Sequence, residues 1–299
     1  MQGLAVRLDR EELEETMPFA NVRGVKMNYK VLGDHGPWVA LSPGGRRDMS
    51  GVELLAGKVA ETGHRVAIFD RRNCGSSDVV IDGQDSEYEI WADDVHELLR
   101  QLGALPVFMG GSSSGCRTSL LFALRHPEAV RGLLLWRVTG GRFACERLAE
   151  EYYGQFIEAA KQGGMAKVCE MEHWKERIDA RPQNRDALMK MKPERFIAVM
   201  SHWRDYFLKG ADLPVIGATE EEIKSIKVAA CIIPGNDNTH GRQTGENLGR
   251  LLQKSEVHIL FPQHYDEPLS PREEWDEKSG EMAVLFGEFM KRQGNSLSR

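Results

Sequence analysis

Ser113 is the residue of this chain whose surroundings best suit covalent chemistry, because glycines stand two positions before and two positions after it. These are Gly111 and Gly115, and the apolar run 107–109 leads into them. A tight turn from a strand into a helix can raise a serine hydroxyl above a sheet, and it leaves no room for side chains at those two positions. The pattern predicts Ser113 as the nucleophile of an acyl-transfer reaction.

Three serines follow one another here, so the centre of the pattern depends on the spacing of the glycines. Ser112 has Gly110 and Ser114 at the flanking positions, whereas Ser114 has Ser112 and Cys116. Only Ser113 has glycine on both sides. Ser112 remains the second choice.

The elements that must position this serine can be predicted from the apolar runs. Most of these runs are continuous and not alternating, which favours strands buried on both faces of a parallel sheet. Helical stretches lie between them, and the clearest opens with the capping-box pair Ser86 and Glu89. The alternation predicts a doubly wound α/β fold. The predicted strands are Trp38–Leu41, Val66–Phe69, Val107–Met109, Leu133–Trp136, Ala229–Ile233 and Val257–Phe261.

The alternation of strands and helices breaks between about Val138 and Lys227. This segment has helical patterning and many large apolar side chains, and it leaves one predicted strand and returns to another. We therefore expect a helical cap at 138–227, inserted into an α/β core at 20–137 and 228–293. Residues 1–19 are expected to form an N-terminal extension.

Two further motifs follow predicted strands. The sequence Asp-Arg-Arg-Asn-Cys-Gly-Ser-Ser-Asp occupies 70–78, and Ser-Pro-Gly-Gly occupies 42–45. Together with the glycine-flanked serine they resemble the α/β-hydrolase superfamily over roughly 25–291, in its capped single-domain serine hydrolase branch. Asn73 stands where the first glycine of the family's D-x-x-G-x-G-x-S turn is usual, and Pro43 replaces the histidine of its oxyanion loop. The resemblance implies a mostly parallel sheet with the cap after its sixth strand.

The resemblance also implies an oxyanion hole made of two backbone N–H groups. These belong to Gly45 and to Ser114, the residue after the nucleophile. Preorganised donors of this kind are worth about 2.7 to 4 kcal/mol each in transition-state stabilisation. No side chain is needed for this role, so the replacement at Pro43 leaves it intact.

A serine hydroxyl needs a base at neutral pH, and in this family the base lies in a loop after the last strand. His264 follows the predicted strand 257–261 and is expected to be that base. His258 lies within the strand and is expected to be packed or exposed at its edge. His240 also competes, but its place in the loop of the acid makes it a candidate pocket wall.

An acid must hold the base in one tautomer, and the family order is serine, acid, histidine. Asp237 lies in the Pro-Gly-Asn-Asp-Asn loop after the predicted strand 229–233 and is expected to be the acid. The spacing from Gly235 to this residue is a residue or two shorter than is common in the family. A turn-forming role for Asp237 is compatible with catalysis.

Three side chains are candidates for substrate binding. Arg46 and Arg137 lie beside predicted active-site loops, where a guanidinium offers a bidentate fork to a substrate carboxylate. Arg47 is expected to be a solvated surface residue. Trp203 is the candidate from the cap, which is expected to sit over the nucleophile.

These residues predict a serine hydrolase that cleaves a small carboxylic ester or lactone through an acyl-enzyme. The resemblance covers esterases, lactonases and C–C bond hydrolases, so hydrolysis of a C–C bond of the meta-cleavage type, or of an amide, stays an alternative. A ligand receptor with vestigial hydrolase activity is the alternative of another class. No metal or organic cofactor is implied. The expected partner is a small molecule, aromatic or carboxylate-bearing, and a homodimer is left open.

Composition excludes several other classes. The 299 residues carry a formal net charge of -6 with acidic and basic residues interspersed, which disfavours nucleic acid as a partner. Five scattered cysteines form no CxxC pair, as expected for reduced thiols and not for a zinc site. The first 18 residues are acidic, and no apolar run approaches the roughly 20 residues that span a bilayer. We expect a cytoplasmic protein without a membrane partner.

Overall fold

An eight-stranded sheet forms the centre of the computed structural model, which describes residues 18–296. The strands lie in the order β1-β2-β4-β3-β5-β6-β7-β8. Neighbours are parallel from β4 to β8, whereas β1 and β2 add antiparallel pairs at one edge. The mostly parallel sheet expected from the sequence is confirmed. The strands are β1 Phe19–Val22, β2 Val25–Leu32, β3 Trp38–Ser42, β4 Arg65–Phe69, β5 Val107–Ser112, β6 Val130–Trp136, β7 Ala230–Ile233 and β8 Ser255–Val257.

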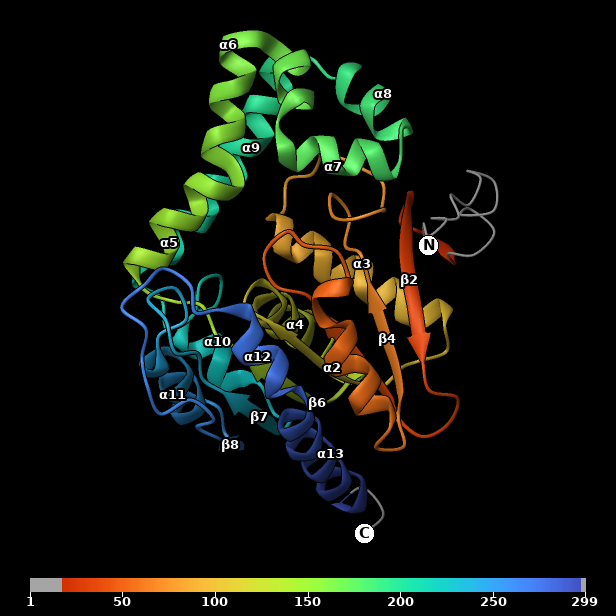
Figure 1. Cartoon of the computed structure of the whole chain (residues 1–299), viewed down its shortest axis with the longest axis vertical. Coiled ribbons are helices and arrows are strands. Elements are labelled where there is room, and N and C mark those ends of the chain that lie inside the picture. Colours follow the sequence, from red (N-terminus) through yellow and green to blue (C-terminus); the bar gives the residue numbers. More distant parts are fainter. Residues whose placement is uncertain (1–17, 297–299) are drawn as a thin grey trace, which may run out of the picture.

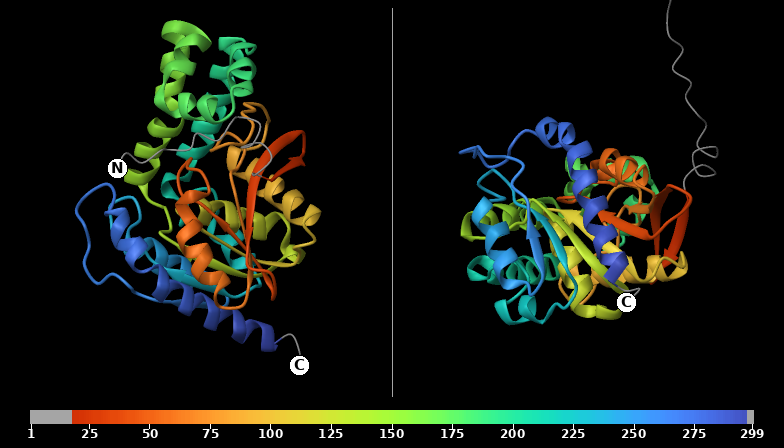
Figure 2. Two further views of the ribbon diagram at one scale, coloured as in Figure 1. Left: turned by 45° about the vertical axis from the view of Figure 1, so that its right-hand side comes forward. Right: turned by 90° about the horizontal axis from the view of Figure 1, so that it is seen from below.

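Helices cover both faces of the sheet (Figure 2). Val39 and Leu41 of β3 pack in one apolar cluster with side chains of α2 and α13, whereas Ala40 packs in a second cluster with side chains of α3, α4 and α11. Burial on both faces explains why the strands appear in the sequence as continuous apolar runs. No helix within residues 18–296 is long and apolar enough to cross a bilayer. These core helices are α2 Ser50–Ala60, α3 Glu87–Gln101, α4 Ser114–Arg125, α11 Arg242–Leu251, α12 Arg272–Glu277 and α13 Ser279–Ser296.

The chain between β6, the sixth strand, and β7 is helical, and its helices α6 to α9 stand together above the sheet in Figure 1. Aromatic packing holds them to one another, since the ring of Trp174 lies 5.3 Å from that of Phe156 and 6.3 Å from that of Phe196 between centroids. We call this segment the cap. Its elements are α5 Arg142–Ala149, the π-helix η2 Glu150–Gly154, α6 Gln155–Glu170, α7 Glu172–Ala180, α8 Gln183–Met189, α9 Pro193–Leu208, the short 3₁₀ helix η3 Lys209–Asp212 and α10 Glu220–Ser225.

The expected boundaries of the cap at 138 and 227 stay a prediction. The N-terminal extension expected at 1–19 lies almost entirely outside the described residues, because the description begins at residue 18.

Two parts of the sheet differ from the sequence-based expectation. The last strand is Ser255–Val257, so the run 258–261 that was included in it is irregular. β8 pairs only with β7 and is partly exposed, so its residues carry a weak apolar signal. The hairpin of β1 and β2 was not expected, and β2 alternates buried and exposed positions at its start and so lacks the continuous apolar run of the parallel strands.

Asn73 takes the backbone conformation that the usual glycine would have at its position. Its φ is +65°, a region that asparagine tolerates better than most residues with a side chain. The side chain adds contacts that glycine lacks, because Asn73 Oδ1 accepts a hydrogen bond of 2.8 Å from the N–H of Val80. The departure from the family motif therefore leaves the turn at 70–78 intact.

The capping box at the start of α3 is present as expected. Ser86 Oγ accepts the N–H of Glu89, and Glu89 Oε2 accepts the N–H of Ser86. We predict that Ser86→Ala lowers the free energy of unfolding by about 1 kcal/mol, because it leaves a helix N–H without an acceptor. Urea denaturation measures this change. Ser86→Thr, which keeps the hydroxyl, serves as the control, and equal stability of Ser86→Ala and wild type would contradict the role of the cap.

Candidate active site

Ser113 sits in the tight turn between β5 and α4 that its flanking glycines predict. Its φ is +55°, which is rare for a residue with a side chain. A Cβ at Gly115 would lie 2.1 Å from the carbonyl oxygen of Ser42, and a Cβ at Gly111 would lie 2.5 Å from the carbonyl carbon of Gly115. Both glycines are therefore required for the strand to turn into the helix here.

The hydroxyl of Ser113 faces an imidazole. Ser113 Oγ lies 2.8 Å from His240 Nε2 and 3.2 Å from Thr139 Oγ1. Ser113 and His240 both line a cavity of about 250 Å³. The arrangement brings a hydroxyl and an imidazole into direct hydrogen-bond contact, as a nucleophile and its base require.

Asp237 holds the other side of the same imidazole. Its Oδ1 lies 2.8 Å from His240 Nδ1 and also accepts the backbone N–H groups of Thr239 at 3.1 Å and His240 at 2.8 Å. These bonds close a tight turn that carries the histidine back over the carboxylate. Ser113, His240 and Asp237 thus form one hydrogen-bonded chain with the geometry of a catalytic triad.

The second oxygen of Asp237 is bound by segments that follow two other strands. Its Oδ2 accepts hydrogen bonds from Arg137 Nη2 at 2.8 Å, and from the N–H and the hydroxyl of Ser270 at 2.9 Å each. Burial by itself raises the pKa of Asp237, but the hydrogen bond and charge of His240 and the charge of Arg137 outweigh burial. The pKa of Asp237 therefore lies well below its usual value.

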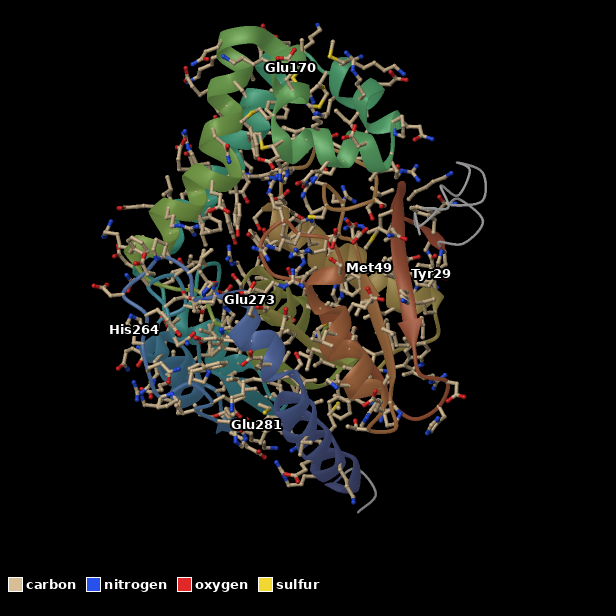
Figure 3. All side chains as sticks on the ribbon, in the orientation of Figure 1. Tyr29, Met49, Glu170, His264, Glu273 and Glu281 are labelled. Atoms are coloured by element: carbon tan, nitrogen blue, oxygen red, sulfur yellow. The ribbon has the colours of Figure 1, made fainter. Side chains whose placement is uncertain are left out.

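The placement of His264 corrects the expectation that it is the base. It is exposed near the edge of the molecule (Figure 3), and its Nε2 lies 3.1 Å from Asn238 Oδ1 on the outside of the loop of the acid. The segment after β8 supports that loop from outside, since the N–H of Tyr265 donates to Asn236 O and the N–H of Asn238 donates to Glu267 O. His240 occupies the position expected for His264.

A local signal could have identified His240. A Cβ at Gly235 would lie 2.3 Å from the Cβ and 2.3 Å from the carbonyl oxygen of His240, so the glycine makes room for the histidine to fold back. The combination of Gly235, Asp237 and His240 within six residues predicts such a turn. The family pattern, which draws the base from the segment after the last strand, favoured His264 instead.

Comparison with known proteins bears on the fold. Residues 45–136 match the family model described as alpha/beta hydrolase fold. The chain is 27% identical over 195 residues to the uncharacterized hydrolase YraK of Bacillus subtilis (strain 168), which covers 63% of this chain and 66% of that protein. The match thus spans just under two thirds of the length of YraK.

Solved structures show the same fold over almost the whole chain. The enol-lactonase from Burkholderia xenovorans LB400 superposes with a TM-score of 0.60 at 19% identity, over 90% of this chain and 99% of that one. An esterase from Exiguobacterium antarcticum superposes with a TM-score of 0.58 at 20% identity, over 89% of this chain and 98% of that one. The chain therefore has the α/β-hydrolase fold.

The loop at 42–45, which is expected to be the oxyanion loop, lies beside Ser113. Gly45 lines the cavity at Ser113 and has a φ of +53°. Its carbonyl oxygen is held by the hydroxyl of Ser114 and by Arg71 Nη2, each at 2.7 Å. Ser114 is the first residue of α4, so its N–H belongs to the positive end of a helix. That these two N–H groups hold an oxyanion stays a prediction.

The three expected substrate-binding residues lie in different surroundings. Arg137 lines the cavity, but one of its nitrogens binds Asp237. Arg46 is buried and paired with Glu87, and it lines a second cavity between core and cap. Trp203 is 1% exposed and donates to the carbonyl oxygen of Asp85, so it packs between the cap and the core segment before α3 and does not line the cavity at Ser113.

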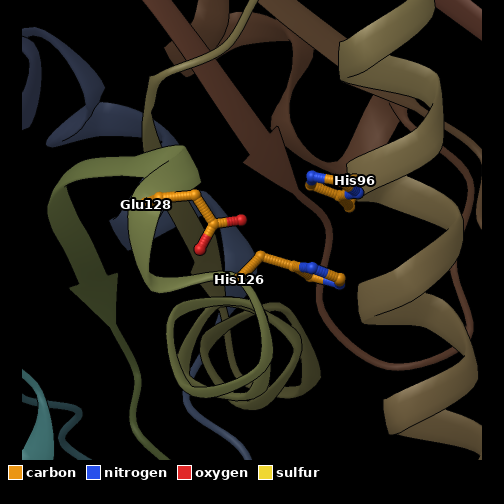
Figure 4. A group of neighbouring side chains, drawn as sticks. All are labelled: His96, His126 and Glu128. Atoms are coloured by element: carbon orange, nitrogen blue, oxygen red, sulfur yellow. The ribbon is translucent and has the colours of Figure 1, made fainter.

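Among residues 18–296, one group gathers enough potential ligands for a metal ion, namely His96, His126 and Glu128 (Figure 4). It lies at the opposite end of α4 from Ser113. The rings of His96 and His126 are stacked, with centroids 3.9 Å apart and 7° between their planes. Lone pairs of imidazole lie in the ring plane, so two parallel stacked rings do not direct them at one ion. We assign no metal site to this group.

The environment keeps His240 neutral at physiological pH. Burial, together with the positive charges of Arg137 and Arg147, lowers its pKa to about 4 against the opposing effect of Asp237. A neutral imidazole can accept a proton from Ser113. The imidazole therefore does not need to lose a proton before it can accept one.

We predict that His240 of the folded protein titrates near pH 4, well below the ordinary value of about 6.5. Its ring is neutral above this pH and protonated below it. NMR titration of the histidine ring resonances measures the pKa, and the His240→Gln variant assigns the signal. A titration of the His240 ring near pH 6.5 would contradict the effect of burial.

Proposed function

We propose that this chain is a serine hydrolase that cleaves a small carboxylic ester or lactone through an acyl-enzyme. The observation that carries the proposal is the continuous hydrogen-bonded chain from Ser113 Oγ through His240 to Asp237. The base is His240, and the expected role of His264 is withdrawn. A cavity opens directly at the nucleophile, which gives a substrate carbonyl access to it.

The mechanism follows from the geometry of these groups. His240 Nε2 accepts the proton of Ser113 as the hydroxyl oxygen attacks the carbonyl carbon, while Asp237 stabilises the imidazolium through Nδ1. The N–H groups of Gly45 and Ser114 stabilise the negative oxygen of the tetrahedral intermediate. His240 then returns the proton to the leaving alcohol. In the second half, it activates the water that releases the acid.

Two observations support an ester or lactone as the substrate class. The cavity of about 250 Å³ suits a small molecule. Two of the superposed structures are an enol-lactonase and an esterase. Hydrolysis of C–C bonds or amides would use the same triad, so the choice among them is a matter for substrate screening.

We predict that wild-type protein forms a single covalent adduct with a fluorophosphonate, because His240 activates Ser113. Intact-mass spectrometry measures the adduct. The adduct is expected to be absent in Ser113→Ala and present in Ser112→Ala, which serves as the matched control. A folded wild-type protein without an adduct would rule out the serine hydrolase. An adduct without turnover of p-nitrophenyl esters would favour the ligand receptor.

We predict that His240→Gln lowers kcat for a p-nitrophenyl ester by roughly 10⁴- to 10⁶-fold, as in other triads that lose the base. His264→Gln is the matched control and is expected to keep wild-type kcat, because its ring contacts only the outside of the acid loop. Steady-state kinetics on both variants measures this. The reverse result, with activity lost only in His264→Gln, would restore His264 as the base.

A further inference from the structure

Three arginines are buried next to the oxyanion loop, and we call them the arginine cluster. Arg46 is 5% exposed, Arg71 is fully buried and Arg117 is 2% exposed. One carboxylate, that of Glu87, lies among them, and it pairs with Arg46. Glu87 also accepts hydrogen bonds from Tyr153 and Asn73, so its oxygens are already engaged. The remaining two guanidinium groups need another source of negative charge.

Arg71 and Arg117 have no acidic partner within residues 18–296. The guanidinium of Arg71 lies 4.3 Å from the centre of the Trp91 ring, and that of Arg117 lies 4.0 Å from the Tyr88 ring and 4.5 Å from the Phe207 ring. The Nε and Nη1 atoms of Arg71, all three side-chain nitrogens of Arg117 and the hydroxyl of Tyr88 are buried without a hydrogen-bond partner.

This arrangement is unfavourable for the protein by itself. A buried charge is costly unless it is paired, and aromatic faces offset only part of that cost. Water can satisfy N–H groups but does not neutralise charge. An anionic group with two or more oxygens supplies both hydrogen-bond acceptors and negative charge, because guanidinium binds it through parallel charge-assisted hydrogen bonds. The arginine cluster therefore has the donor set of an anion site.

The cluster adjoins the proposed reaction centre at two points. Arg117 lies one helical turn after Ser113 on α4, where its N–H donates to the carbonyl oxygen of Ser113. Arg71 Nη2 donates to the carbonyl oxygen of Gly45, which lines the cavity at the nucleophile. The arginine cluster is therefore linked to the loop and the helix turn that flank Ser113.

The wall between the cluster and the cavity belongs to the cap. Tyr152, on η2, lines the cavity. Its ring packs edge-on against that of Phe207, on α9, with 6.1 Å between the ring centroids. The ring of Phe207 in turn covers the guanidinium of Arg117. Entry of an anion requires the side chains of Tyr152 and Phe207 to shift. A second cavity between core and cap is also lined by Tyr152 and Gly45 and reaches Arg46.

We propose that Arg71 and Arg117 bind an anionic group of the substrate, so the ester or lactone cleaved at Ser113 also carries a carboxylate or a phosphate. The proposal rests on the proposed function, because it assumes that a substrate is cleaved at Ser113. The binding of the anion itself does not depend on catalysis. The two ideas can therefore be tested separately.

Binding is tested on the Ser113→Ala protein, which cannot turn over an ester. Adipate or inorganic phosphate is added at constant ionic strength, and Tm is followed by calorimetry. We expect a saturable rise in Tm with at least one of the two anions, because a ligand bound to the folded state stabilises it. The rise is expected to disappear in the double variant Ser113→Ala, Arg117→Met. The same rise in both proteins, or no rise in either, would overturn the anion site.

Selectivity is tested with two p-nitrophenyl esters of equal size. One is the half-ester of adipic acid, and the other carries an isopropyl group in place of the carboxylate. We expect Arg117→Met to lower the ratio of kcat/KM for the charged over the neutral ester by about tenfold or more, since it removes hydrogen bonds between charged groups. Arg117→Lys is expected to restore part of the ratio. An unchanged ratio in Arg117→Met would overturn the substrate role.

Stability separates this role from a structural one. Arg117→Met is expected to raise Tm without added anion, because it removes a buried charge that has no carboxylate partner. Arg72→Met is the matched control, since Arg72 is also buried but forms a bidentate pair with Asp94. It is expected to lower Tm and to leave the selectivity ratio unchanged. A lower Tm in Arg117→Met, with the ratio unchanged, would identify Arg117 as structural.

If neither ester is hydrolysed, the proposed function fails, while the Tm response to anions still reports on the anion site.

Discussion

The fully buried carboxylate of Asp237 is where three segments of the chain meet. Its own loop after β7 supplies donors to one oxygen, and Arg137 after β6 and Ser270 in the segment after β8 supply donors to the other. A buried carboxylate requires such donors, because loss of hydration is otherwise too unfavourable. The need to satisfy this one charge therefore fixes the loops at the carboxyl ends of three neighbouring strands. It also fixes the ring of His240 above Ser113.

The sequence was sufficient for the features that depend on local sterics. The turn at Ser113 could be predicted because two glycines are needed wherever a strand and helix approach so closely, whatever lies elsewhere in the chain. The capping box at Ser86 is local in the same sense. The parallel strands were evident because burial on both faces leaves a continuous apolar run.

The features that depend on tertiary contacts were harder to predict. Three histidines follow Asp237, and the choice between the two loop histidines His240 and His264 depends on which loop folds over the sheet, which chain order does not reveal. The error in the limits of β8 had the same origin, since 258–261 is apolar but irregular. Trp203 does not line the cavity at Ser113, because a large cap residue can equally well pack between the cap and the core.

The acid and the base of the proposed triad lie three residues apart in one turn, and this has a consequence for how the site tolerates change. If the base came from the segment after β8, any insertion in α11 or shift in the register of β8 would alter its distance from the acid. Here the relative position of Asp237 and His240 is set within a single loop after β7. The segment after β8 has only to cover that loop. The position of the base relative to the acid is consequently independent of the length of that segment, which has only to bring the donors of Ser270 to the carboxylate.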